Sequence, residues 1–484
     1  MRRENGLHIE IGKRVAVGLA AAGFLLSPVH VRASEITKAD SANAGTITQN
    51  GGVFDILADG VAGSNAYNVF SKFSLDGGNI ANMYFGLSKD GASALNLLNV
   101  VKDSNGVVIN GVVNAMREHR IGGNIYFINE KGVTVGTTGV INAGSISLVT
   151  PAHLNDVKYS DADFNPADLT NGEITVNPSG TISIAGQLNA VDGINISAGT
   201  IKVVKADGAA QGAVLRTEDS IDFSDVVNIS GLASEVTNRT LTASEDASGD
   251  IVLSAVAVST APSAADEVLS QLGYMTREAT VTTDAGTSII SRGAAKISSS
   301  ARNEDISVKS EASQGLDFLL DEGTNPLGQI VFVTADTTVN GNVTGKTVDI
   351  SATAYNQYNS TNDANKWENI HKDVQGALGF DESWYKIDKL ASTLNVTPIY
   401  SYMETKANVN VGKDAVIRAT RDAAWKTDGA GAFVLDADGL RTAIPALSVN
   451  ANATTNNITS ATTKIDDSYA RRERKVGASP YKDT

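Results

Sequence analysis

An eleven-residue pattern occurs twice in this chain and constrains its fold more than any other feature. Residues 133–143 read VTVGTTGVINA and residues 409–419 read VNVGKDAVIRA, and a weaker copy, ITVNPSG, occupies 174–180. Apolar residues that alternate on both sides of a Gly or Asn turn predict a strand–turn–strand unit. Repeated units of this kind predict a parallel β-helix, because each unit must stack on its neighbours to bury its apolar row.

The composition supports an all-β solenoid. The 484 residues include 45 Gly and only 6 % aromatics, which suits short strands and frequent turns better than a helical bundle. The hydrophobic fraction of 42 % is enough for a continuous core and argues against disorder. The net charge of −15 disfavours nucleic acid and anionic lipid as partners.

Residues 1–33 are predicted to be a secretory signal peptide. A basic N-terminus precedes the apolar run Val15–Leu26, Pro28 ends that run, and Ala33 stands at the predicted cleavage site. The run is too short for a permanent membrane span, and no later segment is apolar enough to form one. The chain has no cysteine, which excludes disulfides and thiolate metal sites. A chain that crosses a narrow pore unfolded needs this property, although many bacterial proteins share it for no such reason.

The rest of the chain divides into segments that differ in the pattern of their apolar residues. Residues 152–172 are polar and are predicted to form a loop extruded from the coil, and Pro262–Leu272 has the spacing of a short helix. The predicted segments are a β-helix domain at 34–200, a degenerate β-helix at 201–354, a small helical insertion at 355–405, and a continued β-helix with a polar tail at 406–484. The lack of a capping segment at the end is compatible with the front fragment of a longer protein.

Three segments of the 34–200 region resemble a known family. The stretches at 68–75 (NVFSKFSL), 78–85 (GNIANMYF) and 123–133 (GNIYFINEKGV), after a signal peptide, resemble the secretion domain of filamentous haemagglutinin-like adhesins. These are exoproteins of two-partner secretion, and the leukotoxin-type filamentous adhesins of Gram-negative anaerobes are the most similar group. The resemblance covers about residues 35–200, and beyond that the sequence is generic β-helix.

The resemblance implies a right-handed β-helix with a capped N-terminus. It also implies a periplasmic intermediate that a partner outer-membrane β-barrel transporter recognises and threads to the outside. In the family motif Asn-Pro-Asn-Gly-Ile, the matching residues here are Asn129, Gly132 and Val133, which become the candidate secretion-motif residues. Glu130 and Lys131 depart from the motif, while Gly132 can still supply a positive φ for the turn.

Three charged clusters were weighed as sites, and each has a simpler interpretation. Residues 118–120 (EHR) fit a solvated turn better than a reactive centre. Residues 436–439 (DADG) resemble part of a calcium loop but lack its further ligands, so an ordinary turn is favoured. The acidic stretch 156–168 could bind calcium, but a solvated loop is the better interpretation. The sequence therefore predicts no catalytic, cofactor-binding or metal-binding residue.

These observations favour a non-enzymatic secreted adhesin or leukotoxin-type exoprotein, displayed at the surface of a Gram-negative bacterium or released from it, with an unidentified receptor. One alternative is a β-helical enzyme that degrades polysaccharide, which would need carboxylates recurring on one face of adjacent coils. The other is an autotransporter passenger, which would need a C-terminal β-barrel.

Overall fold

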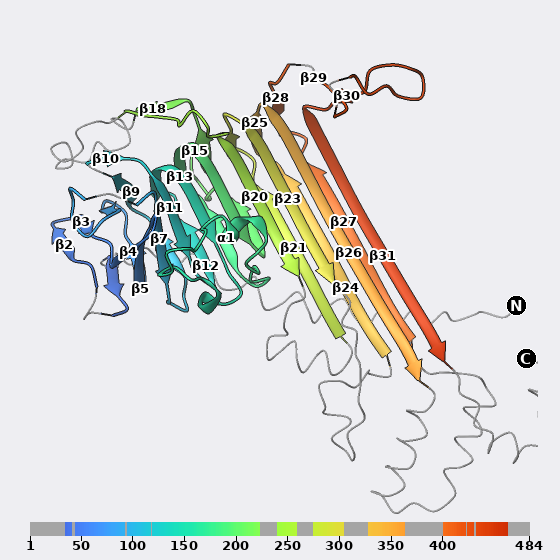
Figure 1. Ribbon diagram of the computed structural model, residues 1–484, viewed down its shortest axis with the longest axis horizontal. Coiled ribbons are helices and arrows are strands. Elements are labelled where there is room, and N and C mark those ends of the chain that lie inside the picture. The colour runs from blue at the N-terminus through green and yellow to red at the C-terminus, as the bar shows by residue number, and fades with distance from the viewer. Residues whose placement is uncertain are drawn as a thin grey trace, which may run out of the picture.

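The chain folds as a parallel β-helix, which confirms the predicted fold class (Figure 1). The computed structural model describes residues 34–40, 44–91, 94–117, 119–222, 240–258, 274–303, 328–363, 400–422, 424–429 and 432–462. The leader at 1–33, the helix expected at 262–272 and the tail after 462 lie outside these residues.

Strands in equivalent positions of successive coils stack in parallel, and they build three faces that we call A, B and C. Three long strands turn a corner and contribute to two faces each. Face A contains β5 (Asn65–Leu75), β7 (Asn96–Val101), β11 (Asn124–Ile128), β13 (Val140–Val149), β15 (Gln187–Ala198), β20 (Asp250–Val258), β23 (Ala294–Asn303), β26 (Thr347–Asp363) and β31 (Leu447–Thr462).

The other two faces follow the same order along the chain. Face B contains the end of β5, β8 (Val107–Ile109), β12 (Gly132–Val135), β14 (Thr181–Ile184), β16 (Thr200–Val203), β21 (Tyr274–Thr283), β24 (Gly328–Val339) and β27 (Tyr400–Val411). Face C contains β3 (Val53–Ile56), β6 (Ile80–Tyr84), β9 (Val112–Arg117), the first parts of β13 and β15, β17 (Val214–Thr217), β22 (Ser288–Ile290), β25 (Asn342–Gly345) and β28 (Ile417–Ala419).

Antiparallel strands cover the N-terminal end of the coil. Strand β1 (Glu35–Lys38) pairs with β5, β2 (Ile47–Asn50) pairs with β3, and β4 (Gly60–Ala62) pairs with the start of β5. The turn between β2 and β3 has Gly51 at φ 58°, as the Asn-Gly dipeptide there predicts. We call β1, β2 and β4 the N-terminal cap, and they satisfy the edge that the first coil would otherwise expose.

The two sequence repeats occupy the same place in the coil. Residues 133–143 and 409–419 both run from face B around a corner to face C. At each corner a side chain in place of the glycine would overlap an asparagine amide oxygen, that of Asn110 for Gly136 and that of Asn340 for Gly412. In the first copy Val133, Val135, Ile141 and Ala143 are buried and Val140 is half-buried, whereas the second copy lies in the last described coil and its Val416 is 59 % exposed.

Two expectations need correction. The weak copy at 174–180 is not a coil segment, because it returns from the extruded loop and only bridges antiparallel from Val176 to Pro151. The insertion expected at 355–405 has strand at both margins, since β26 continues to Asp363 and β27 begins at Tyr400. Its helical content, at 364–399, falls outside the described residues.

Several excursions leave the coil at its corners. The segment 152–172 is an extruded loop, as predicted, and carries the short helices η1 (Leu154–Asp156) and α1 (Asp168–Asn171). Three antiparallel excursions use β10 (Arg120–Ile121) against β9, β18 (Ser220–Asp222) against β19 (Thr240–Thr242), and β29 (Ala424–Trp425) against β30 (Ala443–Ile444). Among the described residues, no helix has the length and apolarity to cross a membrane.

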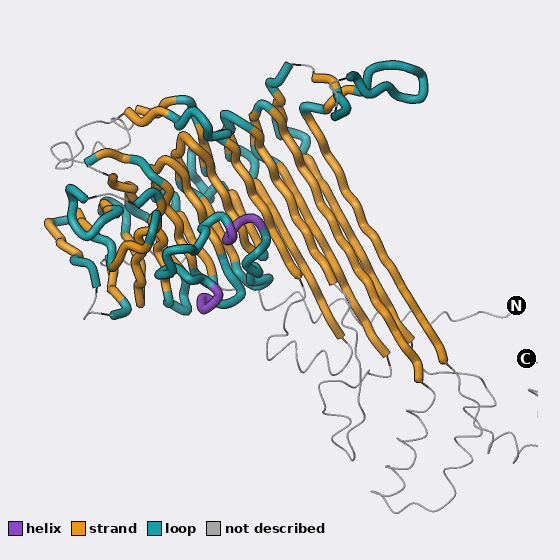
Figure 2. The backbone as a smooth tube through the Cα atoms, viewed as in Figure 1, coloured by secondary structure: helices purple, strands orange, loops and turns teal. Residues whose placement is uncertain are grey.

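The coil changes shape along its length. In the N-terminal half each strand, or each part of a strand that turns a corner, contributes a short stretch to any one face, whereas faces A and B lengthen from β20 onward into two long sheets (Figure 2). Many interior positions in the long sheets carry small side chains: Ala255, Ala257, Ala279, Ser299, Ala301, Ala335, Thr337, Ala352 and Ala354. The hydroxyl oxygens of Ser299 and Thr337 lie 2.8 Å apart and link face A to face B. Small side chains allow the two layers to approach closely.

Candidate functional site

The candidate secretion motif forms the turn from face A to face B between β11 and β12. The Asn129 side-chain amide donates to the backbone oxygens of Val101 at 2.8 Å and Asp103 at 2.9 Å. Its carbonyl oxygen accepts the backbone N–H groups of Lys131 at 2.7 Å and Gly132 at 2.8 Å. Both amide protons and both acceptor positions of Asn129 are thus used, so this side chain fixes the turn and ties it to the preceding coil.

Gly132 and Val133 fill positions that tolerate little change. Gly132 has φ 150°, and a side chain there would overlap the carbonyl oxygen of Thr181 in the next coil. Val133 is buried, with Val107 and Ile182 beside it in the neighbouring coils of face B. The glycine therefore allows close stacking at the corner, and the valine continues the apolar row.

The two residues that depart from the family pattern hold the extruded loop. The Glu130 carboxylate accepts the backbone N–H of Leu154 at 2.6 Å, and the Glu130 backbone oxygen accepts the side-chain amide of Asn177 at 2.6 Å. The Lys131 backbone oxygen accepts the N–H of Thr181 at 3.0 Å. Glu130 thus gives this turn a second role, which is to hold both ends of the loop at 152–172.

Within the folded protein the motif is a structural element. Asn129, Gly132 and Val133 are buried, and Lys131 is the exposed member of the turn. A transporter could contact these three buried residues only while this part of the chain is unfolded.

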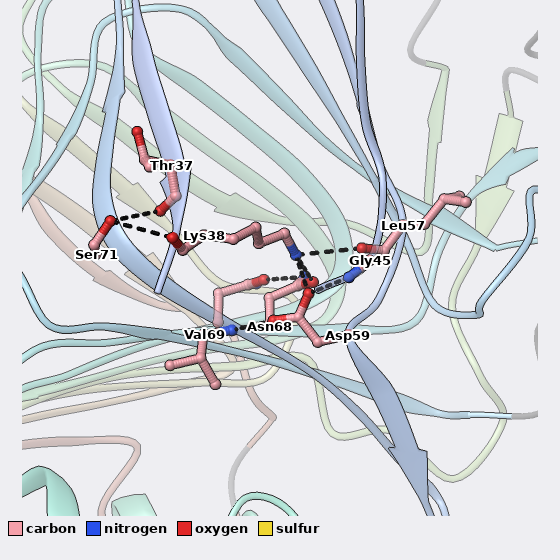
Figure 3. A network of polar contacts seen from close by, with 9 residues as sticks. Thr37, Lys38, Gly45, Leu57, Asp59, Asn68, Val69 and Ser71 are labelled. Atoms are coloured by element: carbon pink, nitrogen blue, oxygen red, sulfur yellow. Dashed lines mark hydrogen bonds and ion pairs between the residues drawn. The ribbon is translucent and has the colours of Figure 1, made fainter. Parts of the chain in front are cut away.

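A buried ion pair holds the N-terminal cap together (Figure 3). The Lys38 ammonium lies 2.6 Å from a carboxylate oxygen of Asp59, and the two side chains are 6 % and 10 % exposed. The ammonium also donates to the backbone oxygen of Leu57 at 3.3 Å and to the side-chain oxygen of Asn68. All three of its protons therefore have acceptors, as a buried ammonium group requires.

The partner carboxylate is equally well bonded. Asp59 accepts the backbone N–H groups of Gly45 and Val69, each at 2.7 Å (Figure 3). The Lys38 ammonium also lies 4.6 Å from the centre of the Phe70 ring, a cation–π distance. Burial lowers the pKa of Lys38, and the bond and charge of Asp59 oppose this. The cluster joins β1 to the segment before β2, the segment after β3, and β5.

A column of four buried asparagines, with a charged residue at each end, runs through six coils along face C. Each side-chain amide donates to the side-chain oxygen of the residue one coil nearer the N-terminus, over distances from 2.9 to 3.1 Å. Arg216 donates to the last amide oxygen at 2.7 Å, and Lys89 pairs with the first carboxylate at 2.6 Å. In order, the members are Asp55, Asn82, Asn114, Asn142, Asn189 and Arg216.

This column has a direction. An ionised Asp55 carboxylate can only accept hydrogen bonds, and the Arg216 guanidinium can only donate them. Every asparagine between them must therefore direct its NH₂ group toward Asp55 and its oxygen toward Arg216. A slip of one residue would place an apolar side chain in the column and leave buried amides unpaired, which costs about 1–3 kcal/mol for each group. The column therefore fixes the register of each coil on the one before it.

Two shorter columns run along face A. In one, Lys38 donates to Asn68, Asn68 to Asn99 at 2.8 Å, and Asn99 to the backbone oxygen of Tyr126 at 3.0 Å, so the cap cluster continues into the second coil. In the other, each side chain donates a hydrogen bond to the side-chain oxygen of the residue one coil nearer the cap. The last acceptor in this column is the Phe164 backbone oxygen on the extruded loop. Its members are Ser145, Asn124, Asn96 and Asn65.

A cavity of about 570 Å³ lies between face A and the extruded loop. Val100 and Lys102 line it from the coil, and Leu154, Tyr159 and Asp161 are among its lining residues from the loop. Its walls mix apolar side chains such as Val100 and Leu154 with charged ones such as Lys102 and Asp161.

The charged clusters weighed from the sequence are turns where the structure describes them. His119 has φ 61° and pairs with Asp90 at 2.6 Å on the surface. The Asp436 carboxylate accepts the backbone N–H groups of Asp438 at 3.0 Å and Leu440 at 2.8 Å, which closes an Asx turn. In the acidic loop, Asp161 accepts the N–H of Asp163. Across the described ranges, no three His, Asp or Glu side chains gather as a metal site.

The sequence matches no known protein-family model and no curated protein. The residue pattern and the architecture therefore carry the functional argument.

Proposed function

We propose that this protein is a secreted exoprotein of the filamentous adhesin type. It crosses the outer membrane of a Gram-negative bacterium unfolded, through a partner β-barrel transporter, and folds outside into a rod for attachment to host cells or other surfaces. The observation that carries the proposal is the N-terminal cap, which gives the coil a closed starting end with its own buried ion pair.

The arrangement of strands supports export coupled to folding. Beyond the first coil, almost every strand finds its hydrogen-bond partners on the coil that precedes it in the sequence. A chain that leaves a pore N-terminus first could therefore add one coil at a time, and each added coil would bury apolar surface and oppose backsliding. The direction of the asparagine column supports the same order, because each new amide finds an oxygen already in place.

The buried motif supports a recognition step that precedes folding. Asn129, Gly132 and Val133 are available to a transporter only in the unfolded chain, and the chain has no cysteine that could lock it folded in the periplasm. Rapid folding in the periplasm would therefore hide the motif as well as block the pore.

Paired cysteines test this proposal. Thr134 on β12 and Ser183 on β14 are direct neighbours in adjacent coils and both are half-buried. Their Cα atoms, as neighbours across a parallel ladder, fall in the separation that a disulfide bridges, about 4.4–6.8 Å. We expect the wild type, expressed with its leader, to reach the medium only when a transporter of this class is present.

The double variant Thr134→Cys/Ser183→Cys should be retained in an oxidising periplasm and released when reductant is added. Each single cysteine variant is the matched control and should be exported normally. Equal release of the wild type with and without the transporter, or normal export of the oxidised double variant, would contradict the proposal.

A further inference from the structure

The extruded loop covers an apolar patch on the outside of face A. Leu98 and Val100 on β7 and Ile128 on β11 alternate with interior residues and so point away from the coil, yet all three are fully buried. They belong to a cluster separate from the interior core, and the loop contributes Val157 and Leu169 to that cluster. Displacement of the loop would expose this patch to water, so the hydrophobic effect holds the loop on the coil.

The loop reaches back from the fourth strand of face A to the first. It leaves the coil after β13, and the Phe164 backbone oxygen accepts the side-chain amide of Asn65 on β5 at 2.8 Å, across 99 positions of sequence. The Tyr159 ring on the loop lies 5.4 Å from the Tyr67 ring on β5, at an interplanar angle of 54°. Strands β7 and β11 lie between β5 and β13, so the loop contacts a coil that is not its neighbour.

The loop also packs against the N-terminal cap. Gly63, in the turn from β4 to β5, has φ 58°, and a side chain there would meet the backbone oxygen of Ala162 at 2.6 Å. The start of the loop is held by Glu130, whose carboxylate accepts the Leu154 N–H. The loop is thus fixed to the cap, to β5, and to the turn between β11 and β12.

These contacts depart from the usual arrangement of a solenoid. In a solenoid each coil contacts only the coils next to it, so the coils can open or form one at a time. A loop that is bonded both to Asn65 on β5 and to Glu130 after β11 loses contacts when any coil between them opens. The coils between these two points therefore share the free energy of the docked loop.

We propose that the extruded loop is a clasp that makes the coils from β5 to β13 open and close as one unit. The clasp closes only when the chain is free to fold as far as Leu169, because that residue completes the buried patch. Its consequence for export rests on the proposed function. The first coils would form singly and reversibly until the loop has left the pore, and would then resist return into the pore together.

Native-state hydrogen exchange of the mature chain tests the clasp. Tyr159→Ser removes the ring that contacts Tyr67, and Tyr159 is half-buried on the loop, so the coils should still fold. We expect backbone amides of β5, β7 and β11 to exchange faster together, by about tenfold, because the variant weakens a contact that these coils share. A change confined to the amides of the loop would overturn the clasp.

Phe332→Ser is the matched control. The Phe332 and Tyr402 rings form a pair of similar geometry, 5.8 Å apart at 56°, but they join the adjacent strands β24 and β27. The control should therefore speed exchange in those two strands and leave β5, β7 and β11 unchanged. Equal changes at β5 in Tyr159→Ser and Phe332→Ser would also overturn the clasp.

Two glycines test the same coupling from the cap. Gly63 and Gly51 both have φ 58°, but open space surrounds Gly51. Gly63→Ala should displace the loop and speed exchange of the Leu154 amide, which is bonded to Glu130. Gly51→Ala carries the same backbone strain and should leave that amide protected. Equal exchange of the Leu154 amide in the two variants would overturn the coupling between the cap and Glu130.

Export tests the consequence separately. With a transporter present, we expect Tyr159→Ser to reach the medium more slowly than Phe332→Ser. Equal rates, together with the expected exchange result, would overturn the role of the clasp in export. Release of the wild type without a transporter would contradict the proposed function, and the exchange result would still decide whether the clasp exists.

Discussion

The two ends of the described coil differ in three ways. They differ in whether other strands cover them, in whether charged residues lie there, and in the size of the side chains in the core beside them. At the N-terminal end, antiparallel strands cover the first coil, and a fully bonded Lys38–Asp59 pair lies inside the cover. At the other end of the described residues, the last described coil has Leu447 and Val449 exposed on β31, a strand without charged residues. Since each coil of a solenoid contacts only its neighbours, the end with the stronger terminal contacts is the one from which the structure can grow.

The cores of the two halves differ in the same direction. All six buried aromatic side chains of the described residues lie between Phe54 and Phe127, whereas beyond residue 250 the buried hydrophobic residues described are only Ala, Val, Ile and Leu, and eight of these nineteen are Ala. Burial of a large apolar side chain contributes about 1.5–3 kcal/mol, and a methyl group contributes much less. The first coils therefore bury more apolar surface per residue than the last, and we expect stability to decrease from the cap toward the last described coil.

The largest expected effect comes from Lys38→Met, which removes one partner of the ion pair in the cap. Asp59 would stay buried without its cation, at a cost of about 3–5 kcal/mol. Urea unfolding followed by circular dichroism measures the loss. Lys406→Met, in the exposed last coil, is the matched control and should change the midpoint little. Equal losses in the two variants would remove the distinction between the ends.

The corner glycine of the candidate motif should give the next largest effect. Gly132→Ala combines an unfavourable φ with overlap on the Thr181 carbonyl, and we expect a loss of about 2–4 kcal/mol. Gly172, with φ 98° and open space around it, is the control that isolates the cost of φ. If Gly172→Ala lowers the free energy of unfolding as much as Gly132→Ala does, the close stacking of coils at this corner contributes nothing to stability.

The repeated corner allows one substitution to be compared in both halves. In Gly136→Ala and Gly412→Ala the new methyl group would meet an asparagine amide oxygen in the same geometry. We expect Gly136→Ala to cost about 1–3 kcal/mol. Gly412→Ala should cost less, because the last coil can open without the others. A larger loss at Gly412 would reverse the proposed gradient of stability.

The smallest effect is a pH dependence from the cap. Burial lowers the pKa of Lys38 below its ordinary value of 10.5. Between the folded pKa and 10.5 the unfolded chain binds more protons, so the free energy of unfolding contributed by this group rises with pH. As the pH rises toward 10.5, the wild type should therefore gain stability relative to Lys38→Met. Burial raises the pKa of Tyr126 above 10.0, so its contribution falls with pH above that value and limits the useful range.

The sequence predicted the coil where its apolar contrast is strong. Val133, Val135 and Ile141 alternate with polar residues, and the structure buries them in stacked rows as expected. The pattern at 201–354 predicts a degenerate β-helix, yet on faces A and B its strands β20, β21, β23 and β24 have 9 to 12 residues each. The reason is chemical, because its inward Ala and Ser residues differ little in hydropathy from their outward neighbours.

The polar interior was the part that sequence patterns missed. Lys38 and Asp59 are 21 positions apart and meet only because β1 runs antiparallel to β5, which no periodicity encodes. The asparagine column had a detectable signal, since Asn82, Asn114 and Asn142 recur after 32 and 28 residues, about one coil apart. For the motif, the sequence located the turn, but the role of Glu130 depends on where the loop at 152–172 folds back.

Pulsed hydrogen exchange during refolding tests most directly whether the rod grows from its capped end. If the rod grows from the N-terminal cap, backbone amides of β3, β5 and β6 gain protection first, those of β13 and β15 follow, and those of β24 and β27 come last. Lys38→Met should delay all three groups together. Protection that begins in β24 and β27, or that arises in all coils at once with no delay in the variant, would contradict growth from the N-terminal cap.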